Sequence, residues 1–185
     1  ISVELAAREL MSGRCDMVLA GGVQAHTPPQ LFMIFCQIGA LSRGNIRPFD
    51  KSAGGTLLGE GAGLLVLKRL ADAEAAGDRI YAVIKGMGTS SDGRAKGLLA
   101  PRREGEVLAL KRAYESAGID PTTVGLVEAH GTGIALGDQT EVESLTEIYG
   151  ERRGHALHHG RARIGVLART RLVEGEARMC GRHVL

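Results

Sequence analysis

The spacing of apolar residues predicts four helices along the chain. Near the start, Val3, Ala6 and Leu10 recur at intervals of three and four residues with the charged Glu4 and Arg8 between them, which is the pattern of an amphipathic helix. Helices are also predicted over residues 70–76, 104–117 and 138–149. The apolar run 31–38 fits either a short helix or the lining of a pocket, and both interpretations stay open.

Short, continuous apolar runs predict four strands, at residues 17–20, 64–67, 80–84 and 124–129. Residues 41–55 separate two of these runs and have the composition of a loop. Strands that lack alternating polar positions are typical of a sheet that is buried on both faces. Because these runs alternate with helices, the sequence predicts an α/β fold whose sheet is covered by helices on both sides.

Composition excludes several classes of protein. Hydrophobic residues make up 44% of the chain and charged residues 24%, which are ordinary globular values and exclude general disorder. Glycine is unusually abundant, at 27 of 185 residues, but it has no three-residue period, so it indicates tight turns rather than collagen. No apolar run approaches the ~18 residues that span a bilayer. Aromatic residues make up only 3%, which disfavours a stacking surface for nucleic acid.

The segment 151–185 differs in composition from the rest of the chain. It holds eight Arg, four His and three acidic residues but no Lys or aromatic residue, so its net charge is +5 against −3 for residues 1–150. It shows no helical or strand period. We interpret it as a divergent tail, of the kind that arises when a GC-rich gene is read out of frame from about codon 151. Its lack of aromatic residues disfavours nucleic-acid binding, and its histidines His155, His158 and His159 lack a preorganised metal geometry.

The chain begins at Ile1 with a helical pattern already under way and with no signal peptide, so we expect it to be a segment of a longer protein. Its three cysteines, Cys15, Cys36 and Cys180, are odd in number and show no CxxC spacing. This disfavours a disulfide framework or a zinc site and indicates reduced thiols in a cytoplasmic protein. We expect Cys15 and Cys36 to be packed in the interior.

The strongest candidate for chemistry is His130 in the sequence HGTG, which follows a predicted strand and precedes a predicted helix. Ligands of open α/β sheets bind just beyond the carboxyl ends of strands. Gly131 and Gly133, on either side of Thr132, would let a substrate approach the backbone closely. An imidazole at this position can donate to a developing oxyanion or transfer a proton. The alternative is a histidine that only hydrogen-bonds a tight turn.

Two further features have a structural interpretation. Asp138 and Glu141 lie three residues apart at the start of a predicted helix, where capping of the helix dipole is favoured over direct catalysis. The glycine-rich stretch GEGAG at 59–63 lacks the Lys-Ser/Thr ending of a phosphate-binding loop, and a strand follows it rather than a helix. We expect this stretch to be a tight turn that leads into the strand.

Five motifs together resemble the β-ketoacyl synthase family, the condensing domains of fatty-acid and polyketide synthases. They stand in family order, and are SGRCDMVLAGGV (12–23), RPFD (47–50), LGEGAGL (58–64), SSDG (90–93) and EAHGTG (128–133). The resemblance covers residues 1–150, and 27–101 is more similar to multidomain polyketide or polyunsaturated fatty-acid synthases than to stand-alone enzymes. It implies a fragment of the layered thiolase-like fold, with the end of its first half joining the start of its second near residues 68–80.

The resemblance also implies a reaction, the decarboxylative Claisen condensation of thioesters carried on an acyl carrier protein. His130 is then one of two histidines that stabilise the enolate, and Thr132, Gly131 and Gly133 face the phosphopantetheine arm of the carrier. The acidic residues Asp138, Glu141 and Glu60 are implied to support the site. No directly bound cofactor, metal, membrane or nucleic acid is implied, and the intact parent is expected to be a homodimer.

The departures from the family pattern bear on activity. The family's nucleophilic cysteine turn would lie just before Ile1, and its second histidine and Gly-Ser-Val-Lys motif have no match after Tyr149. Ile134 replaces a usual threonine, and Gly54 stands where an acidic residue is commoner. We therefore expect the chain to be inactive alone. The alternative is a non-catalytic module that docks an acyl carrier protein or a partner chain.

Overall fold

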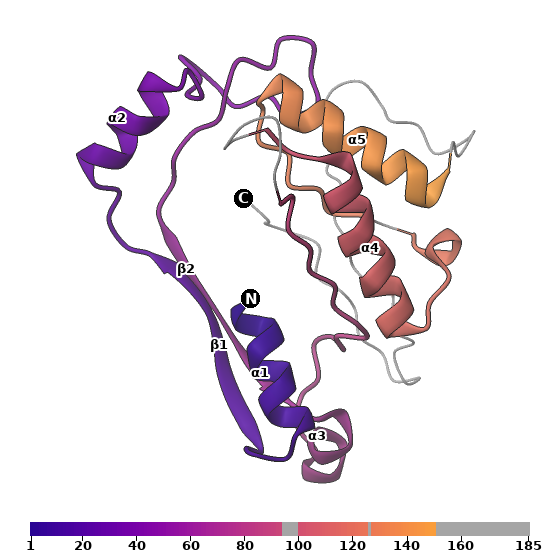
Figure 1. The fold of residues 1–185 in the computed structure, drawn as a ribbon. Coiled ribbons are helices and arrows are strands. Elements are labelled where there is room, and N and C mark those ends of the chain that lie inside the picture. The colour runs from indigo at the N-terminus through magenta and orange to yellow at the C-terminus, as the bar shows by residue number, and fades with distance from the viewer. Residues whose placement is uncertain (94–99, 126, 151–185) are drawn as a thin grey trace.

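The computed structural model describes residues 1–93, 100–125 and 127–150. Along the chain the elements are α1 (Ser2–Met11), β1 (Met17–Gln24), α2 (Pro29–Gln37), β2 (Gly61–Lys68), α3 (Leu70–Ala76), α4 (Arg103–Ala117), the 3-10 turn η1 (Pro121–Thr123) and α5 (Ala135–Tyr149) (Figure 1). All four predicted helices are confirmed, and most of the apolar run 31–38 lies in the helix α2. The predicted tail at 151–185 lies outside the described residues.

Glycine residues end two of the helices. Both α3 and α4 end at a glycine in the left-handed conformation, Gly77 with φ 68° and Gly118 with φ 62°. A residue without a Cβ adopts this conformation without steric cost, so each glycine stops its helix. The helix α5 begins at Ala135, three residues before the predicted start at Asp138.

Strands β1 and β2 form a two-stranded antiparallel ribbon in which Ala20 is opposite Leu65 and Gly21 is opposite Leu64. The strands are longer than predicted, and β2 begins at Gly61, inside the expected turn at 59–63. Glycine is required at Gly21, because a Cβ there would overlap the carbonyl oxygen of Gly63. The close approach of the two backbones explains why glycines occur in both strands.

One guanidinium joins the start of β1 to α1 and α3. Arg69 Nη1 donates to the carbonyl oxygens of Leu10 and Cys15, each at 2.8 Å. Its Nη2 contacts Asp16 and its Nε contacts Asp72, each at 2.5 Å. The two carboxylates raise the pKa of Arg69 further, so its charge is held at all working pH values. The planar guanidinium of Arg69 thereby binds the carbonyl of Leu10 in the last turn of α1 and the carbonyl of Cys15 just before β1, and so orients that strand.

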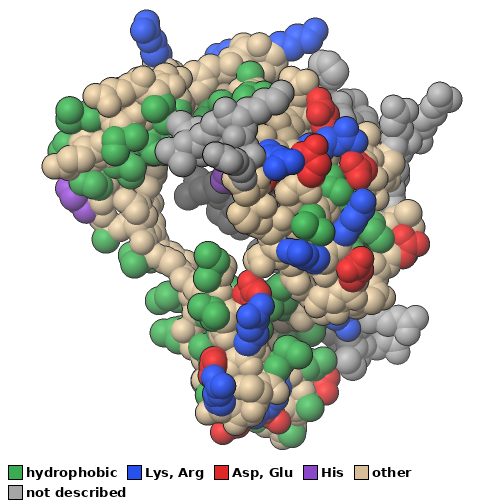
Figure 2. All heavy atoms as spheres, viewed as in Figure 1, with side chains coloured by type: hydrophobic (Ala, Val, Ile, Leu, Met, Phe, Trp, Pro, Cys, Tyr) green, Lys and Arg blue, Asp and Glu red, His purple; other side chains and the backbone are tan. Residues whose placement is uncertain are grey.

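The prediction of a sheet covered on both faces is wrong for the described residues. Helix α1 packs against the ribbon and buries Ala6, Leu10 and Ala20, whereas Leu19 and Val66, paired across the strands, are 65% and 66% exposed. Figure 2 shows apolar side chains spread over the surface formed by α2 and by the two strands. No helix in the described part of the chain is long and apolar enough to cross a membrane.

The predicted strands at 80–84 and 124–129 do not form among the described residues. A strand needs a neighbour that accepts its backbone hydrogen bonds. Among the described residues β1 and β2 are the two strands that pair, and outside them there are isolated bridges, as between Leu41 and Thr56 and at Glu128. The segment after residue 84 instead runs along α4 (Figure 1). A Cβ at Gly86 would lie 2.5 Å from the amide nitrogen of Ala117, and one at Gly88 would overlap the carbonyl oxygen of Ala109. These glycines let the extended chain lie directly on the helix.

Helices α4 and α5 pack side by side and form the second part of the structure (Figure 1). The hydroxyl groups of Tyr114 and Tyr149 are 2.6 Å apart, and their rings meet edge to face with centroids 6.0 Å apart. Nearby, Arg103 and Lys111 of α4 both reach Glu147 of α5, at 2.9 and 3.3 Å. This pair of helices carries the loop that contains His130.

Candidate functional site

The backbone of His130 is held by a carboxylate from the second turn of α5. Glu141 Oε1 accepts a hydrogen bond from the amide of His130 at 2.6 Å, and Oε2 accepts one from the amide of Gly131 at 2.9 Å. One ionised carboxylate thus binds two successive amides, a strong charge-assisted arrangement. The position of His130 is therefore fixed relative to α5.

Asp138 binds the next part of the same loop and also a segment far away in the sequence. Its Oδ1 accepts from the amide of Gly133 at 3.1 Å and faces the Thr132 hydroxyl at 3.4 Å. Its Oδ2 accepts from the amide of Phe49 at 2.7 Å. The residue is only 4% exposed, so these donors replace the water that an ionised carboxylate requires. Asp138 lies in the first turn of α5, where a carboxylate complements the helix dipole as predicted, and Asp138 and Glu141 also bind loop amides.

The RPFD segment and Gly55 pack against the loop that contains His130. Phe49 has a φ of 60°, in the left-handed region that residues with a side chain rarely adopt. Pro48 and Phe49 contact Gly131 so closely that a Cβ there would lie 3.1 Å from each. The carbonyl of Gly133 accepts a hydrogen bond from the amide of Gly55 at 3.0 Å. Local sequence does not place Phe49 or Gly55 at the site, although Phe49 belongs to the RPFD motif.

The side chain of His130 is exposed, in contrast to its fixed backbone. No hydrogen bond to its imidazole forms among the described residues, so the ring nitrogens are accessible to a ligand. The amides of His130, Gly131, Gly133 and Ile134 are already bonded, to Glu141, Asp138 and the Thr132 hydroxyl. These four amides are not available to an oxyanion. The exposed imidazole of His130, by contrast, is a donor that could face a negative charge.

Glu60 makes a separate contact. Its Oε1 accepts a hydrogen bond from the amide of Thr27 at 2.8 Å, which links the chain just before β2 to the turn that precedes α2. Thr27 is buried and its hydroxyl has no hydrogen-bond partner among the described residues. The structure therefore brings His130, Thr132, Asp138 and Glu141 together with the two glycines, and gives Glu60 a different partner.

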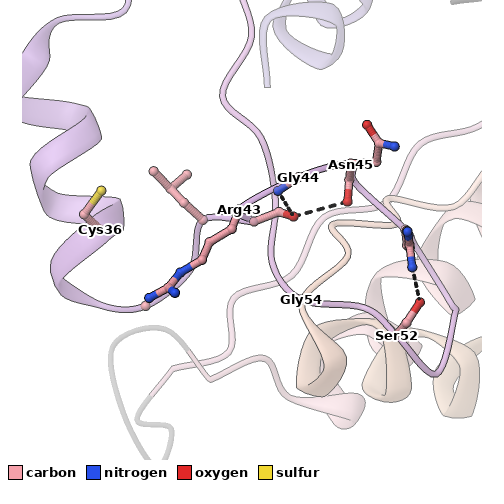
Figure 3. A pocket seen from close by; sticks show the side chains of 10 residues that line it. Cys36, Arg43, Gly44, Asn45, Ser52 and Gly54 are labelled. Carbon is pink, nitrogen blue, oxygen red and sulfur yellow. Dashed lines mark hydrogen bonds between the residues drawn. The ribbon is translucent and has the colours of Figure 1, made fainter.

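A hollow of about 800 Å³ lies between the last turn of α2 and the loop 39–54 (Figure 3). Arg47 donates to the hydroxyl of Ser52 at 2.9 Å on one side of it. Gly54, which also lines it, adjoins the Gly55 that binds the His130 loop. The hollow therefore lies next to the contact between Gly55 and the His130 loop. The helix α2 contributes Cys36 to its wall, so both interpretations of the run 31–38 apply.

The two cysteines of the described residues lie in different environments. Cys36 lines the hollow and is exposed, so the prediction that it packs in the interior is wrong: the helix α2 buries none of its residues. Cys15 is half-buried, and its carbonyl accepts from Arg69. No cluster of three potential metal ligands exists in the ranges 1–93, 100–125 and 127–150. The tail histidines lie outside the described residues.

Comparison with known proteins gives two family matches along the chain. Residues 1–73 match the family described as "Beta-ketoacyl synthase, N-terminal domain", and residues 81–166 match "Beta-ketoacyl synthase, C-terminal domain". The first match ends within α3, residues 74–80 lie between the two matches, and the second continues to residue 166, within the segment 151–185.

Curated relatives are large multidomain proteins. The chain is 44% identical over 154 residues to a phenolphthiocerol/phthiocerol polyketide synthase of Mycobacterium tuberculosis, covering 83% of this chain and 8% of the relative. It is 42% identical over 159 residues to a polyunsaturated fatty acid synthase of a Thraustochytrium species, covering 85% and 6%. These matches confirm the predicted likeness to multidomain synthases.

Solved structures agree with the sequence matches. The ketosynthase from module 6 of the bacillaene synthase of Bacillus subtilis superposes with a TM-score of 0.76 at 42% identity, over 80% of this chain and 27% of that one. The chain spans about a quarter of the length of this solved ketosynthase and less than a tenth of the curated relatives above. From its two matched halves, its relatives and its fold, the chain belongs to the β-ketoacyl synthase family and is a thiolase-like α/β segment of a ketosynthase domain.

Proposed function

We propose that residues 1–150 supply the enolate-stabilising part of a ketosynthase that extends acyl chains in a multidomain polyketide or polyunsaturated fatty-acid synthase. The observation that carries the proposal is the His130 loop. Glu141 and Asp138 fix its backbone, while the imidazole stays exposed and unbonded among the described residues. A hydrogen-bond donor whose position is fixed before the reaction is what stabilisation of a developing oxyanion requires.

In the proposed reaction, the substrate is a malonyl-type thioester on the phosphopantetheine arm of an acyl carrier protein. The bond between its carboxylate and the adjacent carbon breaks, carbon dioxide leaves, and the electron pair moves onto the thioester oxygen as an enolate. The ring N–H of His130 donates to that oxygen. The enolate carbon then attacks an acyl group held on a cysteine, forms the new carbon–carbon bond and releases the cysteine thiolate.

The remaining roles follow from the same proposal. Thr132, between Gly131 and Gly133, lies beside His130 and would contact the pantetheine arm through the exposed side of the loop. Its hydroxyl is partly engaged, since it accepts from the amide of Ile134 at 3.2 Å. Residue 134 is isoleucine, so its side chain provides no second hydroxyl for a hydrogen bond to the pantetheine arm. Asp138 and Glu141 act by positioning the loop, and Glu60 by holding the turn before α2.

The test replaces the matched segment of the bacillaene module 6 ketosynthase with residues 1–150 of this chain, because that protein supplies the rest of the domain. We expect the chimera to release carbon dioxide from a malonyl-loaded carrier protein. His130→Ala should lower that rate by about 10²–10³-fold, as the loss of an oxyanion donor does. An equal rate in the H130A chimera would refute the role of His130.

The 185-residue chain alone is expected to release no carbon dioxide and to form no condensation product, because it lacks the family's cysteine turn and second histidine motif. The second candidate function is a non-catalytic module that docks a carrier protein. It predicts an inactive chimera together with capture of the carrier protein by the 185-residue chain, so the two measurements separate the alternatives.

A further inference from the structure

One face of the β1–β2 ribbon, here named the far face, is apolar and uncovered among the described residues. Successive side chains of a strand point to opposite faces, and Ala20 is buried on the face against which α1 packs. Leu19 therefore lies on the far face, together with Val66, its partner across the strands. The large side chains of the far face are between 56% and 71% exposed, and they are Met17, Leu19, Val23, Leu64 and Val66.

The far face carries little charge. Gly21 and Ala62 occupy two of its other positions, and Lys68 stands at one end, where its Nζ contacts Asp78 at 2.6 Å. Neither strand alternates apolar with polar residues, which is the pattern of strands covered on both faces rather than of strands with one face in water. The sequence of the ribbon is therefore that of a strand pair between two covering layers, and α1 supplies only one of them (Figure 1).

The family matches indicate which part of a ketosynthase supplies the second cover. Both strands lie within residues 1–73, which match the N-terminal domain, and the match to the C-terminal domain begins at residue 81. In a complete ketosynthase, any further part of the N-terminal domain therefore precedes the position of Ile1. The bacillaene ketosynthase is long enough to contain such a part, because this chain covers only 27% of its length.

We propose that the far face binds the part of a ketosynthase N-terminal domain that precedes the position of Ile1, and that it binds this part even as a separate chain. The partner is apolar where it touches the ribbon and covers the far face as α1 covers the opposite one. A second copy of this chain could lie on the same face, but two copies would still lack that part of the domain. The inference goes beyond the proposed function, since association of the two pieces needs no substrate.

The test co-expresses the full 185-residue chain, carrying an affinity tag, with an untagged piece of the bacillaene module 6 ketosynthase that ends where its match to this chain begins. One measurement is the amount of the piece recovered with the tagged chain. The other is amide hydrogen exchange in peptides that cover residues 17–24. We expect a soluble complex with one copy of each chain, in which these peptides exchange at least about tenfold more slowly than in the 185-residue chain alone.

The double substitution Leu19→Lys and Val66→Glu places charges where the partner would bury them, so recovery of the piece should fall at least about tenfold. Leu19→Ala with Val66→Ala removes apolar surface without adding charge and should give an intermediate recovery. The matched control is Leu108→Lys with Leu136→Glu, which introduces the same two charged residues at exposed apolar positions of α4 and α5. The control should recover as much of the piece as the unsubstituted chain.

Several results would overturn the proposal. They are a piece that is not recovered in soluble form with the tagged chain, equal recovery by the unsubstituted chain and the charged ribbon variant, an equal loss in the ribbon variant and the control, and a tagged chain that associates only with further copies of itself. Binding is measured without substrate, so its failure would leave the catalytic role of His130 to the chimera assay, in which the two parts are joined covalently. An inactive chimera would likewise leave the recovery of the piece unchanged.

Discussion

The carboxylate of Asp138 accepts a hydrogen bond from the backbone amide of Phe49 across 89 residues of sequence, at 2.7 Å. The amide belongs to a residue held at a φ of 60°, a conformation that costs of order 1–3 kcal/mol for a residue with a side chain. Because Asp138 also binds Gly133, one buried carboxylate joins the RPFD segment to the His130 loop. The site is therefore assembled from two segments that are distant in the chain.

We expect Asp138→Asn to destabilise this link. The amide side chain presents one oxygen and one NH2 group, so it cannot accept from Phe49 and Gly133 on separate oxygens, and one donor is left facing another. The expected loss in free energy of unfolding is about 1–3 kcal/mol. Urea unfolding of the ketosynthase chimera measures it.

The matched control for this substitution is Asp120→Asn, at an exposed turn where the Asp120 carboxylate accepts from the amide of Thr122 at 2.8 Å. Asparagine keeps one acceptor oxygen and serves as well as aspartate at such a cap. A stability loss at Asp138 no greater than that at Asp120 would contradict the structural role of the link.

We expect Glu141→Gln to impair catalysis by the chimera more than its stability. Glutamine can accept from only one of the amides of His130 and Gly131 with its single oxygen, so the imidazole is no longer held in one place. Misplacement of a catalytic group by about 1 Å can cost up to ~10²-fold in rate, and we expect a loss of about 10–100-fold.

Carbon dioxide release from the malonyl-loaded carrier protein measures this loss. Glu143→Gln is its control, since Glu143 is exposed and interacts with Gln139 on the outer side of α5. An E141Q chimera as fast as the E143Q chimera would show that the carboxylate does not position His130.

We expect the isolated 185-residue chain to bind a hydrophobic dye and to self-associate through the uncovered face of the β1–β2 ribbon. The cross-strand pair of Leu19 and Val66 is about two-thirds exposed on that face, and neither strand has a second neighbour in the ranges 1–93, 100–125 and 127–150. Exposed apolar strands with open edges favour association.

The double substitution Leu19→Lys and Val66→Glu should reduce dye fluorescence and shift sedimentation toward the monomer, because the pair remains complementary in charge across the strands. The control is Leu5→Lys with Met11→Glu on α1, which changes two exposed apolar side chains outside the ribbon. A monomeric unsubstituted chain that binds no dye would contradict the prediction.

Much of the secondary structure follows from local sequence. The helices α1, α3, α4 and α5 depend on apolar periodicity and on stop signals such as Gly77 and Gly118, which act within a few residues. The family motifs likewise identify the ketosynthase segment, because they are read as short strings in order. His130 is conspicuous for the same reason, since its loop follows a strand-like run directly.

The tertiary structure alone decides which of these pieces meet. Runs 80–84 and 17–20 look alike as strings, but within the described part of the chain only the second pairs, because pairing depends on a neighbour and a register rather than on apolar content. The bonds from Asp138 to Phe49 and from Ser144 to Glu106 join residues 89 and 38 positions apart, and no local periodicity encodes them. The sequence by itself determined the helices and the family; packing determined how His130 is held, because its supports come from helices and a loop that are brought together only on folding.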